Sequence, residues 1–259
     1  MTAPLLVSFA AAGGAPPASH ELVRVFRDGG VRVLLATAWP GLGPLAEAGV
    51  YALELDTAAL VELERLAAAA EPGQSPDVDA PLQPGSGRFV LRLGEADRRL
   101  RWDPFTTPPE PLATLAARLR ALLGEAHAHP VAAVRLGVEA ASAVELAYTF
   151  TALGREPVTL TVPEGGLRAR VVAAPGPPAD PPPLAWAREA LPVAAEAGSA
   201  ELAPGETLTL TATTEAPAPG LHRVDGFARV ALDLPGAADP AEAHLEATIG
   251  AGPIAVEVR

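Results

Sequence analysis

The clearest strand signal in the chain is Glu201-Leu202-Ala203-Pro204-Gly205-Glu206-Thr207-Leu208-Thr209-Leu210-Thr211-Ala212-Thr213. Proline presets φ at one corner of a turn and glycine accepts the positive φ of the next, so Pro204-Gly205 marks a turn. After that turn, Leu208 and Leu210 alternate with threonines, which is the two-residue period of a strand with one buried face. The stretch therefore predicts a turn that leads into a half-buried β-strand.

The same pattern extends over residues 130–259, where short alternating runs are separated by proline and glycine. Such a pattern is typical of an immunoglobulin-like β-sandwich, the fold we expect for this half. Trp186 is expected in its core. The other residues expected to fill the interior are Leu146, Tyr148, Phe150, Leu208 and Leu210. The expected strands include Val134–Val138, Val144–Phe150, Val158–Val162, Leu167–Val172, Leu221–Leu232 and His244–Val258.

Residues 1–129 are different, because helical periodicity appears among the strands. Asp56 is a candidate N-cap for a helix that reaches Ala70. A second helix follows Pro111, with a leucine stripe from Leu112 to Leu123. The expected strands are Glu21–Arg27, Tyr51–Leu55 and a hairpin over residues 88–102, with Met1–Ala12 as a strand or a loose arm. We therefore expect an α+β domain, with two helices on an antiparallel sheet.

Composition excludes several chemistries. The chain of 259 residues has no cysteine and no lysine, so it offers no thiol nucleophile, no disulfide and no Schiff base. The absence of lysine and asparagine is typical of a GC-rich bacterial genome. A net charge of −12 argues against nucleic-acid and anionic membrane partners and is compatible with a partner that carries a positive cleft. Without a membrane-length apolar run or a signal peptide, a cytoplasmic location is expected.

Two family resemblances follow from short motifs. The C-terminal half is similar to the intracellular proteinase inhibitor (BsuPI) family in four features. These are the corner Gly154–Leu160, the strand around Trp186, the Pro204–Thr207 turn and the strand start Pro219–Leu221. The N-terminal half resembles emfourin-type inhibitors of thermolysin-like metalloproteases in the strand that ends at Arg27–Gly30, the strand–helix unit Tyr51–Ala70 and the hairpin. The resemblances imply an immunoglobulin-like fold and a proteinase inhibitor.

Candidate catalytic and metal-binding residues are sparse. His127 and His129 lie two residues apart, unlike the i, i+4 pair of a metal-binding helix. His222 and Asp225 could belong to a serine hydrolase triad, but the sequence contains no Gly-x-Ser-x-Gly motif to supply the nucleophile. Asp77 and Asp79 lack the further ligands of a calcium loop. We therefore expect no catalytic site, no metal and no cofactor.

The sequence thus predicts a non-catalytic binding protein, a proteinase inhibitor that occludes a protease cleft without a covalent bond. The expected partner is a bacterial protease, either thermolysin-like or of the intracellular serine type. Exposed glycine turns and aromatic side chains commonly anchor protein interfaces, and the expected contact residues are Arg27, Asp28, Gly29, Gly30 and Trp39. The alternatives are a structural or assembly module that binds another protein through a sandwich edge or loops, and a hydrolase with an unfamiliar site.

Overall fold

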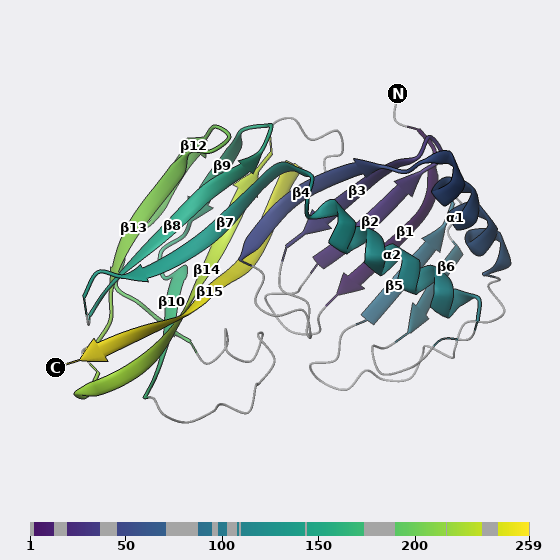
Figure 1. The fold of residues 1–259 in the computed structure, drawn as a ribbon. Helices are drawn as coiled ribbons and strands as arrows, with labels where there is room; N and C mark the ends of the chain where they lie inside the picture. The colour runs from purple at the N-terminus through teal and green to yellow at the C-terminus, as the bar shows by residue number, and fades with distance from the viewer. Residues whose placement is uncertain are drawn as a thin grey trace. The chain divides into compact units, whose positions relative to one another are not determined.

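The computed structural model describes residues 3–12, 20–36, 46–70, 88–94, 98–102, 108, 110–142, 144–173, 190–215, 217–234 and 243–258. Over these residues the chain is mostly antiparallel β-structure with two α-helices (Figure 1). The prediction of a β-rich, sandwich-like fold with only two helices is confirmed at this level. The chain divides into two units, one of Met1–Leu35 with Val50–Pro130 and the other of Ala36–Gly49 with Val131–Arg259.

The division differs from a single boundary at residues 129 and 130. One break does fall between Pro130 and Val131, but the second unit also takes in Ala36–Gly49. Strand β4 (Glu47–Glu54) therefore begins in the second unit and ends in the first. Its opening residues are held by β7 (Pro130–Ala140), since Arg135 contacts the Glu47 carboxylate at 2.7 Å. Local periodicity carries no information on a pairing between residues 88 positions apart.

The first unit contains one antiparallel sheet in the order β4-β3-β2-β1-β5-β6. Strand β1 lies between β2 and β5, and its Phe9 is opposite Val23 on one side and Leu91 on the other. All three side chains are buried, so the N-terminal segment is a central strand and not a loose arm. The bounds are β1 Leu5–Ala12, β2 His20–Phe26, β3 Gly30–Leu35, β5 Arg88–Leu93 and β6 Arg98–Trp102.

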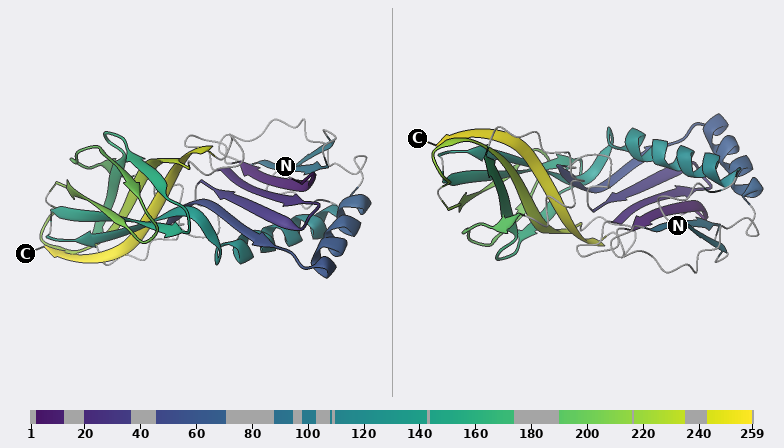
Figure 2. Two further views of the ribbon diagram at one scale, coloured as in Figure 1. Left: turned by 90° about the horizontal axis from the view of Figure 1, so that it is seen from above. Right: turned by 90° about the horizontal axis from the view of Figure 1, so that it is seen from below.

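Both helices cover the same face of this sheet (Figure 2). Helix α1 (Thr57–Ala69) begins at the predicted cap, where the Asp56 carboxylate accepts a hydrogen bond of 2.8 Å from the Ala59 amide. Helix α2 (Leu112–Ala126) buries the whole predicted leucine stripe, as the 3.6-residue period requires of an amphipathic helix.

The second unit has two sheets. One runs β13-β8-β7 and continues into the first residues of β4, and the other runs β11-β10-β14-β9-β12, with β15 paired to β14. The buried Tyr148 on β8 links the sheets, because its hydroxyl donates a hydrogen bond of 2.8 Å to the carbonyl oxygen of Arg168 on β10. Burial raises the pKa of the Tyr148 phenol. The bounds are β8 Glu145–Gly154, β9 Val158–Val162, β10 Leu167–Ala173, β11 Leu191–Pro192, β12 Gly198–Leu202, β13 Thr207–Thr213, β14 Gly220–Asp233 and β15 His244–Val258.

The interior of this unit differs from the prediction at two positions. Leu146, Tyr148 and Phe150 are buried as expected, whereas Leu208 and Leu210 are only half-buried. The reason is that, among the described strands, β13 lies at the end of its sheet and pairs with β8 alone. The segment Glu201–Thr213 also divides, since Glu201 and Leu202 belong to β12 in the second sheet, and the Pro204-Gly205 turn leads into β13 in the first.

Candidate functional site

The predicted contact segment Arg27–Gly30 is the turn between β2 and β3, and its backbone is held in place. The Gly29 amide donates to the Phe26 carbonyl oxygen at 3.1 Å, and the Gly30 amide donates to the Asp28 carboxylate at 3.0 Å. The Gly29 carbonyl oxygen accepts from the Leu55 amide at 2.9 Å. Gly29 has φ +92°, and a Cβ there would stand 3.2 Å from the Leu55 carbonyl oxygen. Only glycine combines this dihedral with this approach.

The turn presents two opposite charges to solvent, because the side chains of Arg27 and Asp28 are both exposed. The Arg27 guanidinium lies 3.8 Å from the Glu64 carboxylate of α1, and these side chains are 55% and 42% exposed. An ion pair with this separation and this solvent exposure contributes little to the free energy of unfolding. The turn therefore combines a fixed backbone with charged side chains that remain accessible.

Trp39, the fifth predicted contact residue, lies outside the described residues, as do Trp186, Asp77 and Asp79. Their expected roles stay predictions. The structure accordingly places four of the five predicted contact residues, and it places them in one turn.

A second cluster of polar side chains lies on β14, where His222 and Asp225 are buried. The Nε2 atom of His222 is 2.7 Å from the Ala218 carbonyl oxygen, and Nδ1 has no partner among the described residues. The two residues are three positions apart on a strand, so their side chains point to opposite faces. Among the described side chains, His222 bonds neither a carboxylate nor a serine hydroxyl, and the arrangement of a triad is not formed there.

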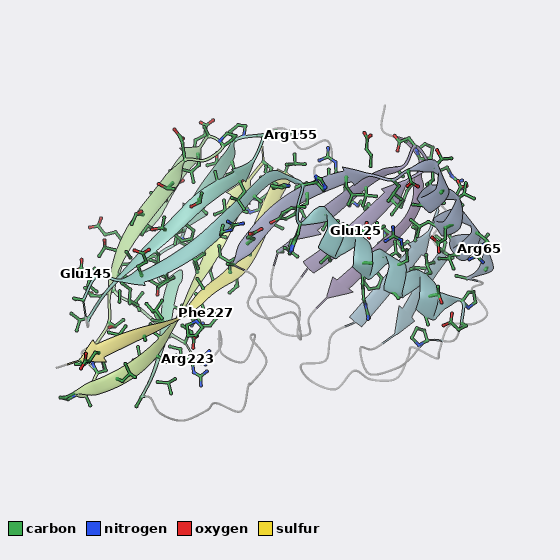
Figure 3. The ribbon with its side chains drawn as sticks, viewed as in Figure 1. Arg65, Glu125, Glu145, Arg155, Arg223 and Phe227 are labelled. Atoms are coloured by element: carbon green, nitrogen blue, oxygen red, sulfur yellow. The ribbon has the colours of Figure 1, made fainter. Side chains whose placement is uncertain are left out.

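The face that carries Asp225 is rich in arginine. Asp225 is directly opposite Arg170 of β10, and Arg168 is opposite Phe227, so these four side chains share one face. Arg223, on the same face of β14 and labelled in Figure 3, donates to Asp225 Oδ1 at 3.3 Å. The Arg223 guanidinium offsets part of the free-energy penalty of burying the Asp225 charge, while Oδ2 of the same carboxylate has no partner among the described residues.

The candidate pair His127 and His129 does not form a metal site with the other described residues. His127 follows α2, with its ring centroid 5.3 Å from that of Tyr51, and His129 is exposed on the same turn. Within the described ranges, no three histidine, aspartate or glutamate side chains are grouped so that they could hold a metal ion. The same ranges contain no helix that is both long enough and apolar enough to cross a membrane.

The sequence suggested a sandwich edge as an alternative binding surface but did not show which strand forms it, and the structure places β13 at an edge. The Ala152 amide of β8 donates to the Glu206 carbonyl oxygen at 2.9 Å, and the Thr214 amide donates to the Val144 carbonyl oxygen at 2.8 Å. Backbone groups alternate in direction along a strand, so the even-numbered residues of β13 bond to β8. The backbone amides and carbonyls of Thr207, Thr209 and Thr211 therefore point away from the sheet.

Thr213, which belongs to the same outward series, shows what such groups do when a partner is present. Its amide donates to the Ala194 carbonyl oxygen at 2.9 Å, and its own carbonyl oxygen accepts from the Ala194 amide at 3.1 Å. In the described part of the chain no strand other than β8 is hydrogen-bonded to Thr207–Thr211, and Gly198 of β12 lies against the Leu210 side chain. The alternation of Leu208 and Leu210 signalled a strand but contained no sign of its place at an edge.

Comparison with known proteins adds no assignment: no family model matches the chain, and no curated protein matches it.

Proposed function

We propose that this protein is a non-catalytic binding protein that inhibits a proteinase by non-covalent occlusion of its cleft. The observation that supports the proposal best is the turn Arg27–Gly30, whose backbone is fixed while Arg27 and Asp28 remain exposed. A contact loop that is already ordered loses little conformational entropy when it docks, so more of its interaction energy appears as affinity. Trp39 is proposed as an aromatic anchor of the contact.

The proposal includes the finer architecture that the two resemblances imply. The unit that holds both helices is an emfourin-like α+β domain, and the other unit is an immunoglobulin-like sandwich similar to the BsuPI family. The partner is a protease, thermolysin-like or of the intracellular serine type, met in the cytoplasm. The net charge of −12 favours association with a positively charged cleft over a nucleic acid or an anionic membrane.

Inhibition assays test the proposal directly. The purified chain is titrated into a thermolysin-like metalloprotease and into an intracellular subtilisin-type protease, and residual peptidase activity is measured. We expect dose-dependent inhibition of one of them. Arg27→Ala, Asp28→Ala and Trp39→Ala should each weaken it, and Trp39→Ala should reduce binding by on the order of 2 kcal/mol, as for a central aromatic anchor.

Arg155→Ala is the matched control, because Arg155 is also an exposed arginine in a turn but belongs to the other unit (Figure 3). If Arg155→Ala weakened inhibition as much as Arg27→Ala does, the assignment of the turn as the contact site would be contradicted. Full protease activity at saturating protein would contradict inhibition of these two classes.

The open edge of β13 favours a second candidate function, that of an assembly module which binds another protein through strand pairing. The two functions use different surfaces. Variants of the turn test the first, and variants of β13 test the second.

A further inference from the structure

The segment Thr207–Thr211 lacks the sequence features that usually protect a sheet edge, and among the described residues the edge of β13 is bonded at Thr213, by Ala194. It contains no charged residue, no proline and no glycine, and its register with β8 runs without a bulge from Thr207 to Thr213. Natural edge strands are commonly blunted by such features, because a regular row of outward amides and carbonyls recruits another strand. An edge left this regular is a surface for strand pairing.

We propose that β13 is a dimerisation edge, at which Thr207–Thr211 pairs antiparallel with the same segment of a second copy of this chain. The segment Thr207-Leu208-Thr209-Leu210-Thr211 reads the same in both directions about Thr209. A two-fold axis through Thr209 therefore places Thr209 opposite Thr209, Leu208 opposite Leu210, and Thr207 opposite Thr211. A two-fold interface requires a surface that is complementary to itself, and this segment meets that requirement.

The direction of the backbone groups fixes the register. With the axis at Thr209, all three outward residues of one copy face outward residues of the other, which gives about six inter-strand hydrogen bonds. An axis at Leu210 would bring Thr213 into the ladder, but its amide and carbonyl already bond to Ala194. An axis at Leu208 would move Thr211 out to Gly205, in the turn. Thr209 is therefore the favoured centre.

The charges near the edge permit this register despite the net charge of −12. Glu206 would face Ala212 of the second copy, and the new ladder would end before Thr213, whose amide and carbonyl bond to Ala194. No two carboxylates are then directly opposite, which avoids the like-charge pairs that destabilise antiparallel strands. The side chains of Thr207, Thr209 and Thr211 are exposed on one face of β13, whereas Leu208 and Leu210 on the opposite face are half-buried.

Single cysteines test the register, because the chain has none of its own. Residues opposite each other in a hydrogen-bonded antiparallel pair have Cα atoms about 5.5 Å apart, which a disulfide can bridge. Thr209→Cys should therefore form a covalent dimer on mild oxidation. In Thr207→Cys the two thiols would be four residue spacings apart, about 13 Å, and the protein should stay monomeric on a non-reducing gel.

The double variant Thr207→Cys/Thr211→Cys should cross-link again, since each cysteine then faces the other residue in the second copy. Equal cross-linking of Thr207→Cys and Thr209→Cys would overturn the register. The absence of a Thr209→Cys dimer at high protein concentration would overturn the pairing.

A charge swap at the axis provides a second test that does not depend on oxidation. Thr209→Asp and Thr209→Arg each place like charges opposite one another, and each should weaken dimerisation at least about tenfold in sedimentation velocity. An equal mixture of the two variants should recover the dimer as a heterodimer. Thr209 is exposed, so circular dichroism should show both variants folded.

A wild-type chain that is monomeric at millimolar concentration would overturn the proposal, as would a dimer that neither substitution weakens. Protease inhibition by the same variants should be unchanged, because they lie outside the turn Arg27–Gly30. Loss of dimerisation and loss of inhibition are therefore separately measurable.

Discussion

The turn Arg27–Gly30 exposes the side chains of Arg27 and Asp28, and the edge of β13 exposes three threonines, but the two segments differ in whether their backbone groups have partners. In the turn, the amides of Gly29 and Gly30 and the carbonyl of Gly29 all have partners within the chain. Along the edge, the backbone groups of Thr207, Thr209 and Thr211 point away from β8. Two exposed segments thus offer different chemistry to a partner: the turn offers side chains, and the edge offers backbone.

The largest expected effect separates the two sides of β13. Leu210→Pro removes an amide that donates to β8 and should reduce the free energy of unfolding by about 3 kcal/mol. Thr209→Pro removes an outward amide, and should reduce it by only about 1 kcal/mol, as for proline on an edge strand. Denaturant unfolding of dilute protein measures both. Leu210→Ala is the control, because it measures the loss of unfolding free energy due to the side chain alone. Equal effects of the two proline substitutions would refute the assigned direction of the backbone groups.

The next effect compares two turn glycines. A Cβ added at Gly29 (φ +92°) would stand 3.2 Å from the Leu55 carbonyl oxygen, whereas one added at Gly205 (φ +84°) would meet nothing within 4 Å. Gly29→Ala should therefore destabilise the chain by about 2 kcal/mol, and Gly205→Ala by about 1 kcal/mol from the dihedral alone. Thermal melting reports the difference. A Gly29→Ala variant as stable as Gly205→Ala would mean that the turn is not held against Leu55.

A third test concerns the hydrogen bond by which Tyr148 joins the two sheets of the second unit. Tyr148→Phe removes the hydrogen bond to the Arg168 carbonyl, and the free energy of unfolding should fall by about 1 kcal/mol. Because the folded-state pKa of Tyr148 is raised, its neutral form is favoured by folding, and this contribution is full below the ordinary tyrosine pKa.

Stability of the wild-type chain should therefore decline as the pH rises above about 10, and Tyr148→Phe should show a shallower decline. Unfolding free energies measured across that range, with the variant beside the wild type, provide the check. Parallel pH profiles would show that Tyr148 is not the group responsible.

The smallest effect is expected at the turn's ion pair. Arg27→Ala should change the free energy of unfolding by less than about 0.5 kcal/mol, because Arg27 and Glu64 are exposed and 3.8 Å apart. Glu64→Ala is the matched control and should behave alike. A loss above about 1 kcal/mol in either variant would make the arginine part of the fold rather than an accessible contact.

The sequence predicted what depends on neighbours along the chain. Asp56 caps its helix and the leucines from Leu112 to Leu123 are buried, because helical spacing alone decides which face is apolar. It did not predict that β4 would begin in the second unit, since the contact between Glu47 and Arg135 joins distant parts of the chain.

The candidate sites follow the same division. The pair Gly29-Gly30 predicted a turn after the strand that ends near Arg27, and the structure has a turn there. The β13 edge was not predicted, because the alternation of Leu208 and Leu210 is the same in a central strand as in an edge strand. Only the order of strands in the sheet distinguishes the two cases.

Amide hydrogen exchange by NMR, recorded on dilute and on concentrated protein, follows both sides of β13 in a single experiment. We predict that the Leu210 amide is protected at both concentrations, because it donates to β8. The Thr209 amide should exchange freely in dilute protein and become protected in concentrated protein, where a second copy covers it. Protection of Thr209 in the dilute monomer would show that the edge is covered within the chain, and free exchange at the high concentration would show that no second copy pairs with it. Either result would contradict an open edge that pairs with itself.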